Sequence, residues 1–125
     1  MTNTALPIKR YMRAALKEFH EYVMHDILGH IPNLTSRAMF GGYGLYQDGR
    51  IFGIITDVGE LRFKVDDTNR AQYEAHGSTP FVYTGHKSKK PTTMQYYLVP
   101  EEITENKEIV TDWVFESASI GDKKP

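Results

Sequence analysis

Cysteine is absent from the 125-residue sequence, which excludes disulfides, thiolate nucleophiles and cysteine-ligated zinc. Long apolar runs are absent as well, because no segment approaches the ~20 residues needed to cross a bilayer. The first residues carry basic charge but no uninterrupted apolar stretch of signal-peptide length. We therefore expect a cytoplasmic protein that does not associate with a membrane.

The chain has almost no net charge. Its 15 Lys and Arg and 16 Asp and Glu residues sum to −1, which argues against the broad phosphate neutralisation that drives many nucleic-acid binders. Direct binding of nucleic acid is therefore expected to be weak. The charges are segregated, however, with acidic residues in the C-terminal segment and basic residues in the middle third: Glu101, Glu102, Glu105, Glu108, Asp112 and Glu116, against Arg62, Lys64, Lys87, Lys89 and Lys90.

Motifs for catalysis, cofactors and metals are also missing. The glycine-rich run from Phe40 to Gly44 precedes a predicted strand and lacks a following Gly-Lys-Ser/Thr, whereas a phosphate-binding P-loop opens a helix. His20 and His25 are five residues apart, which places them off a common helix face and argues against a zinc site. No serine or threonine lies in a nucleophile elbow. We predict no enzyme, no cofactor and no metal site.

The residues that are present suit one domain. Hydrophobic residues make up 40% of the chain, with 6 Phe and 8 Tyr, which is enough for one core but too little for two. We expect residues 1–13 to be a flexible N-terminal extension, residues 14–120 a single domain and residues 121–125 a C-terminal tail.

Three helices are predicted. Apolar residues recur at spacings of three and four from Ala14 to Gly29, which indicates an amphipathic helix that the glycine ends. Residues 71–75 form a short helix between an Asp-Asp-Thr start signal and a glycine. After Pro100, an apolar stripe that includes Trp113 predicts a final helix with an acidic face toward water.

Five strands are predicted. The stretch from Tyr43 to Val65 alternates with a period of two and is interrupted by turn sequences at Asp48-Gly49 and Asp57–Glu60, which predicts a three-strand antiparallel meander. Residues 81–84 and 93–99 predict two more strands. The fold class is therefore α+β, in the order helix, three-strand meander, helix, two strands, helix, with one antiparallel sheet covered by helices.

Several motifs occur in an order that resembles the TfoX N-terminal domain family. The similarity runs from about Phe19 to Val114. Its motifs are Met39-Phe40-Gly41-Gly42-Tyr43-Gly44-Leu45-Tyr46, Asp48-Gly49, Phe63-Lys64-Val65-Asp66, Gly77-Ser78-x-Pro80-Phe81 and Met94-x-Tyr96-Tyr97-x-Val99-Pro100.

The resemblance implies a secretion-chaperone-like α+β fold. Through the full-length regulator, it also implies a link to the activation of competence genes for DNA uptake. It implies no catalysis and supplies no binding residues. Because the chain ends at residue 125, we expect it to lack the second domain of that regulator.

The strand pattern predicts which residues share a face of the sheet. On one apolar face, Leu45 is expected opposite Phe52, and Ile54 opposite both Tyr43 and Phe63.

On the other face, Gly44 is expected beside Gly53, and Lys64 beside Gly53 on the next strand, with Tyr46 paired to Ile51. Two facing glycines next to a cation would leave a notch that admits a ligand or a partner backbone. The candidate binding residues are therefore Tyr46, Gly44, Gly53, Arg62 and Lys64. In the competing interpretation, a helix of the same chain packs there and the glycines merely make room.

A second group is expected to be structural. Glycine permits positive φ or a bulge where the chain enters the sheet. This group is the motif Met39, Phe40, Gly41 and Gly42.

A basic loop between the last two predicted strands is the best local candidate for phosphate contact. A solvated loop is the favoured interpretation of the same composition. Its residues are His86, Lys87, Lys89 and Lys90.

These observations favour a non-enzymatic regulatory module that binds a protein partner, with the transcription machinery as one such partner. The alternative is a small-ligand sensor that uses the notch formed by Gly44, Gly53 and Lys64. A cryptic enzyme is the third hypothesis. A homodimer is compatible with the sequence, which identifies neither a partner nor a regulated gene.

Overall fold

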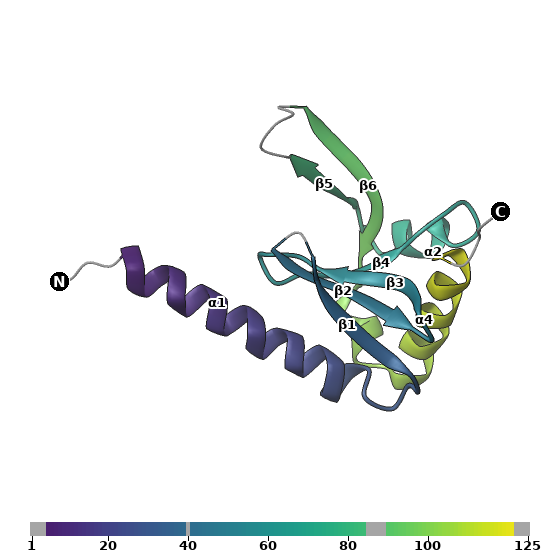
Figure 1. Cartoon of the computed structure of the whole chain (residues 1–125). Coiled ribbons are helices and arrows are strands. Elements are labelled where there is room, and N and C mark those ends of the chain that lie inside the picture. The colour runs from purple at the N-terminus through teal and green to yellow at the C-terminus, as the bar shows by residue number, and fades with distance from the viewer. Residues whose placement is uncertain (1–4, 40, 85–89, 122–125) are drawn as a thin grey trace.

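The fold is α+β, as predicted. A computed structural model describes residues 5–39, 41–84 and 90–121, with the side chains of residues 12–39, 41–84 and 90–120. In chain order, the elements shown in Figure 1 are α1 (Ala5–Tyr22), η1 (Val23–Ile27), β1 (Leu34–Met39), β2 (Gly42–Gln47), β3 (Arg50–Ile55), β4 (Leu61–Lys64), α2 (Arg70–Glu74), β5 (Pro80–Thr84), β6 (Pro91–Leu98), α3 (Glu101–Thr104) and α4 (Lys107–Gly121). None of the described helices is both long enough and apolar enough to cross a membrane.

The strands form one sheet in the order β1-β2-β3-β4-β6-β5, and each neighbouring pair is antiparallel. The prediction of a three-strand meander was wrong, because β1 precedes it and pairs with β2 along its whole length. This edge strand has the sequence Leu-Thr-Ser-Arg-Ala-Met and contains no fully buried residue. It therefore lacks the apolar alternation by which a half-buried strand is recognised.

Helix α1 begins at Ala5 rather than at Ala14. Residues 5–13, expected to lie outside the first helix, therefore continue it by more than two turns. Figure 1 shows this first half of α1 extending away from the sheet. Its second half reaches the sheet and continues into the core.

The end of this helical segment is wound more loosely. In η1 the Leu28 backbone N–H donates to the carbonyl of Val23 at 2.9 Å, which is the i to i+5 bond of a π-helix. The wider turn leaves Val23, Ile27 and Leu28 all buried. Gly29 then follows because a Cβ there would lie only 2.2 Å from the carbonyl oxygen of His25.

The predicted final helix is divided into α3 and α4. Asn106 separates them, and its Oδ1 accepts a hydrogen bond from the Ile109 N–H at 3.1 Å. The Asn106 carbonyl accepts from Val110 N–H at 2.9 Å. This is an N-cap, which satisfies a backbone donor that a new helix start leaves unpaired. The prediction of one continuous helix after Pro100 was therefore wrong at this point.

The core lies between one face of the sheet and the helices. Trp113 is 6% exposed, and its ring centroid lies 4.4 Å from that of Tyr73 on α2. The hydroxyl of Ser117 on α4 donates to the carbonyl of Lys64 at 2.7 Å, which ties α4 to the end of β4. The expectation that Trp113 anchors the final helix in the core is confirmed.

His20 fastens the second half of α1 to the sheet. Its ring stacks on Tyr43 with centroids 3.8 Å apart and planes 8° apart, and its Nε2 lies 2.8 Å from the Ser36 hydroxyl. Burial lowers the pKa of His20 and outweighs nearby Glu21, which raises it, while His25 lowers it further. This contact therefore favours the neutral imidazole.

Truncation of the anchor ring tests the core. Trp113→Ala should lower the free energy of unfolding by about 3–5 kcal/mol, because it removes a large buried ring and leaves a cavity. Phe115→Ala on the same helix is the control, since Phe115 is 43% exposed and should cost far less. Urea denaturation measures both. A Trp113→Ala protein as stable as the control would contradict the packing of α4 on the sheet.

Acidification tests the His20 contact. Because the folded-state pKa of His20 lies below the 6.5 of an unperturbed histidine, the stability from neutral His20 is present above that value. It is lost as the pH falls through the folded-state pKa. His20→Gln should therefore reduce the drop in Tm between about pH 7.5 and pH 5.5. His30→Gln, at an exposed histidine, should leave the drop unchanged, and equal drops in both variants would refute the role of His20.

Candidate interaction face of the sheet

The register of β2 and β3 differs from the prediction. Tyr46 pairs with Ile51 as expected, but the register shifts next to this pair, and Gly44 pairs with Ile54 while Gly53 pairs with Leu45. The shift is a β-bulge, which inserts one extra residue and changes every pairing beyond it. The predicted pair of Gly44 with Gly53 is therefore wrong.

Gly53 lies on the core side of the sheet, where it also pairs with Phe63. A Cβ at Gly53 would lie 2.7 Å from the carbonyl oxygen of Arg62 and 2.9 Å from Cδ1 of Phe63. Close approach of β4 explains this glycine, so it makes room for its own chain. Lys64 does not lie beside Gly53, because the residue of β4 opposite Gly53 is Phe63. On the other side of β4, Lys64 pairs with Tyr96 on β6.

The other four candidate residues do share one face. Gly44 pairs with Ile54, and Ile54 pairs with Arg62. Tyr46 and Lys64 follow at a spacing of two, which keeps them on the same side of the pleated sheet. The helices pack against the opposite side, because their buried residues cluster with Leu45 and its neighbours there. In Figure 1, no described helix crosses the face that carries Gly44, which we call the helix-free face.

Cations lie over aromatic rings on the helix-free face. The Nζ of Lys64 is 5.2 Å from the ring centroid of Tyr96, and the guanidinium of Arg37 is 5.6 Å from that of Tyr46. Such separations fit cation–π attraction. The strand residues that the register places on this face include no Asp or Glu among those described: Thr35, Arg37, Met39, Gly44, Tyr46, Ile54, Arg62, Lys64, Tyr96 and Leu98.

Arg62 is buried, and its side chain is used in hydrogen bonds that stabilise the sheet, so it is not a main candidate for binding a partner. It is 7% exposed and donates to Glu60 Oε1 at 2.9 Å. It also donates to the carbonyl of Thr79 at 2.7 Å and to that of Tyr96 at 3.3 Å. These bonds connect β4 to the β5 and β6 region. The accessible cations of the helix-free face are therefore Arg37, which is exposed, and Lys64, which is half-buried.

Tyr96 keeps its proton in this setting. Burial raises the pKa of Tyr96, and the nearby Tyr46 raises it further. A phenol with a raised pKa is neutral at physiological pH. The charge of the helix-free face is therefore positive and comes from its Arg and Lys side chains.

The structural role predicted for the motif before β2 is visible in three of its residues. Gly41 has φ of 77°, which favours glycine. A Cβ at Gly42 would lie 1.9 Å from the carbonyl oxygen of Ile55, and one at Gly44 would lie 3.0 Å from Cε of Met39. The thioether of Met39 thus occupies the space beside Gly44. Phe40 lies outside the described residues.

Most of the predicted phosphate loop cannot be placed on this face. His86, Lys87 and Lys89 lie outside the described residues, while Lys90 is exposed just before β6. The phosphate contact therefore stays a prediction.

Three histidines in the described part of the chain lie near hydroxyl or carboxylate groups. His20 contacts Ser36, and the Nε2 of His30 lies 2.6 Å from the Thr111 hydroxyl. The Nε2 of His76 lies 3.4 Å from Glu102 on the exposed surface. In the part of the chain that the structure describes, none of these histidines joins a hydroxyl to a carboxylate, which is the arrangement that activates a hydroxyl nucleophile. Among the described residues no group of His, Asp and Glu could hold a metal ion.

Sequence reasoning missed two residues of this face. Arg37 was missed together with the edge strand β1, whose only signal was its position between a helix stop and the Gly41-Gly42 entry. Tyr96 was recognised as one of two tyrosines on alternate faces, but its pairing with Lys64 depends on the non-consecutive order of β4 and β6.

Comparison with known protein families identifies a family for this chain. The family model described as TfoX N-terminal domain matches residues 26–120, which is more than half of the chain. The matched region includes the six described strands and α3, and it covers α4 up to the residue before its end at Gly121. No curated protein matches the sequence.

Two glycine substitutions test the register. Gly53→Ala should lower the free energy of unfolding by about 1–3 kcal/mol, because its methyl group meets the backbone of Arg62. Gly44→Ala is the matched control, since its methyl group meets the flexible end of Met39 and, at 3.4 Å, the ring of Tyr46, but no backbone, and it should cost less than about 1 kcal/mol. Chemical denaturation compares the two. Equal costs, or a larger cost at Gly44, would contradict the bulged register.

Proposed function

The chain belongs to the TfoX N-terminal domain family, and we propose that it is a non-enzymatic regulatory module that binds a partner protein through the helix-free face. The observation that carries this proposal is a sheet with one face covered by helices and the other lined by cations over aromatic rings. Large rings supply contact area, and Arg and aromatic residues are enriched where proteins bind one another.

The charge of the face favours an acidic partner segment. Arg37 and Lys64 provide accessible positive charge, and no described strand residue on this face is acidic. Complementary charge on a partner would guide its approach and fix its orientation. Nucleic acid is the weaker candidate for two reasons. The whole chain carries a net charge of −1. Tyr96 is only 8% exposed, so its ring offers little surface on which a base could stack.

Membership of the family supports the regulatory part of the proposal. The resemblance connects this domain to a regulator of competence genes, so a component of the transcription machinery in the cytoplasm is the first partner to test. The family is not one of known enzymes, and the described histidine pairs supply no catalytic arrangement. The small-ligand sensor is not proposed further, since Gly44 and Gly53 lie on opposite faces and do not form its notch.

Charge reversal on the face tests the proposal. Immobilised wild-type chain should capture a protein from cell extract, with and without nuclease, and the double variant Arg37→Glu, Lys64→Glu should capture at least about tenfold less. Lys107→Glu is the control, because Lys107 is an exposed lysine at the start of α4 and should not affect capture. The melting temperature of each variant verifies folding.

Two outcomes would contradict the proposal. Equal capture by the double variant would exclude the helix-free face. Recovery of nucleic acid alone, or loss of capture on nuclease treatment, would exclude a protein partner.

A further inference from the structure

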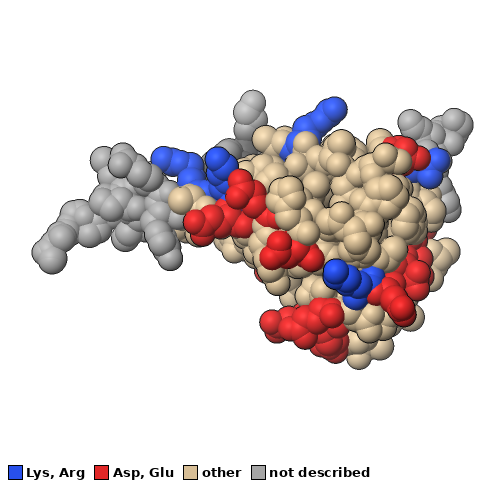
Figure 2. All heavy atoms as spheres, turned by 90° about the horizontal axis from the view of Figure 1, so that it is seen from below, with Lys and Arg blue, Asp and Glu red and all other residues tan. Residues whose placement is uncertain are grey.

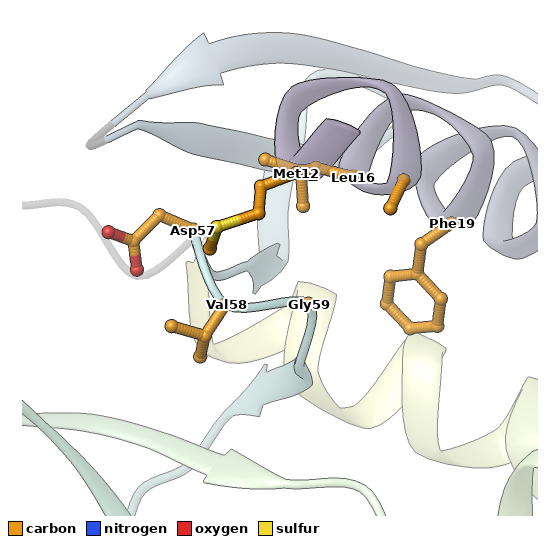
Figure 3. A pocket seen from close by; sticks show the side chains of 7 residues that line it. Met12, Leu16, Phe19, Asp57, Val58 and Gly59 are labelled. Atoms are coloured by element: carbon orange, nitrogen blue, oxygen red, sulfur yellow. The ribbon is translucent and has the colours of Figure 1, made fainter. Parts of the chain in front are cut away.

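An apolar groove runs along α1 and reaches Leu98, at the border of the helix-free face. One cavity of about 260 Å³ lies between Met12 and Leu16 of α1 and the turn at Val58 (Figure 3). A second cavity of about 380 Å³ adjoins it and extends to α3. The two share Phe19 and Gly59 in their walls, so they lie next to each other along α1, and we call the pair the groove.

Exposed apolar side chains concentrate in this groove. Seven large apolar residues in the described part of the chain are exposed, and four of them line it: Met12 at 54%, Tyr22 at 51%, Val58 at 71% and Leu98 at 38%. A contiguous apolar surface of this kind is characteristic of an interaction site.

The groove is acidic at its edge. Among the described side chains, its walls include Asp57, Glu60, Glu101 and Glu105 and no Lys or Arg. Glu60 already pairs with Arg62, so the other three supply most of the negative potential. An occupant should therefore combine an apolar surface with positive charge.

The first half of α1 in this same chain has both properties. Between Ala5 and Arg13 the sequence of the helix includes Lys9, Arg10 and Arg13 and no acidic residue. This half extends away from the sheet (Figure 1). Figure 2 shows basic side chains next to the free end of α1 and mostly acidic ones over the rest of that side.

A chain cannot place this helix in its own groove. Met12, Leu16, Phe19 and Tyr22 of α1 form one wall of the groove, and the helix is continuous from Ala5 to Tyr22. At about 1.5 Å per residue its 18 residues span about 27 Å, which is long enough to reach across a neighbouring molecule.

We propose that two copies of this chain form a symmetric dimer in which α1 of each copy lies in the groove of the other. A two-fold axis makes the contact self-complementary, with the two α1 helices antiparallel and each basic half beside the acidic edge of the other copy. Apolar contact around Met12 and Val58 supplies the centre of the interface, and the charges supply its rim.

Sedimentation equilibrium of the full chain over a wide concentration range tests the dimer. The wild type should reach twice its chain mass of 14.3 kDa. Val58→Glu should raise the dimer dissociation constant by at least about tenfold, because it buries a charge in the contact. Val82→Glu is the matched control, since Val82 is 53% exposed on β5 and does not line the groove. Circular dichroism verifies that both variants fold.

Charge exchange provides a second measurement. Arg13→Glu and Glu101→Lys should each weaken dimerisation, and high salt should weaken the wild-type dimer. The double variant Arg13→Glu, Glu101→Lys should recover part of the loss, because the opposite charges face each other again.

Three results would overturn the proposal. The first is a chain that stays monomeric at every concentration. A monomer whose groove binds a segment of another protein would count as this result too. The second is a dimer that Val58→Glu leaves intact. The third is a dimer on which neither single charge variant has any effect.

Discussion

The close approach of β3 to β4 at Gly53 determines the geometry of the sheet. With no side chain at this position, the Arg62 backbone can come within 2.7 Å of where a Cβ would stand. The neighbouring bulge leaves Phe52 fully buried, with its ring 5.4 Å from that of Phe63 in an edge-to-face contact. Two large rings thus enter the core from adjacent strands, and a two-layer domain needs such rings because only one face of its sheet is packed.

A sheet that is packed on one side must stabilise its other side by different means. On the helix-free face, polar side chains of the strands stabilise the sheet through hydrogen bonds and contacts with neighbouring rings. Arg62 on β4 donates to Tyr96 on β6 and to Thr79, the residue before β5, and Lys64 covers the ring of Tyr96. The aliphatic stem of each cation shields apolar surface while its charged end stays near water. The same arrangement that protects the rings therefore gives the helix-free face its positive charge.

The sequence was sufficient for the features that local chemistry determines. The turn at Asp48-Gly49 was predicted from residue types that tolerate positive φ, and both residues adopt it, at 56° and 82°. Trp113 was identified from the helical period alone. Four of five candidate binding residues were assigned to the correct shared face, because alternation within a strand needs no knowledge of its partners.

Features that depend on contacts distant in the sequence were not predicted. The bulge next to Tyr46 has no local signal, yet it moves Gly53 to the core side. Strand β1 was missed because an edge strand with mostly exposed residues carries no apolar alternation. The first half of α1 was missed for a related reason, since a helix that extends away from the body of its own chain has little core to face. Residues that look unconstrained in one chain are the ones for which contacts with a second chain should be considered.

The helix-free face and the groove along α1 meet at Leu98, which the register places on the face and which also lines the groove. The two accessible cations of the face, Arg37 and Lys64, do not line the groove, so a dimer formed through α1 would leave the cationic part of each face outside the contact. Such a dimer would present two copies of the cationic face on one rigid body. A partner with two acidic segments, or a dimeric partner, would then bind more tightly than a single face allows, because the second contact forms at a high effective concentration. Because the His20 contact fastens α1 to the sheet, its stability would influence partner binding without any change to the binding face.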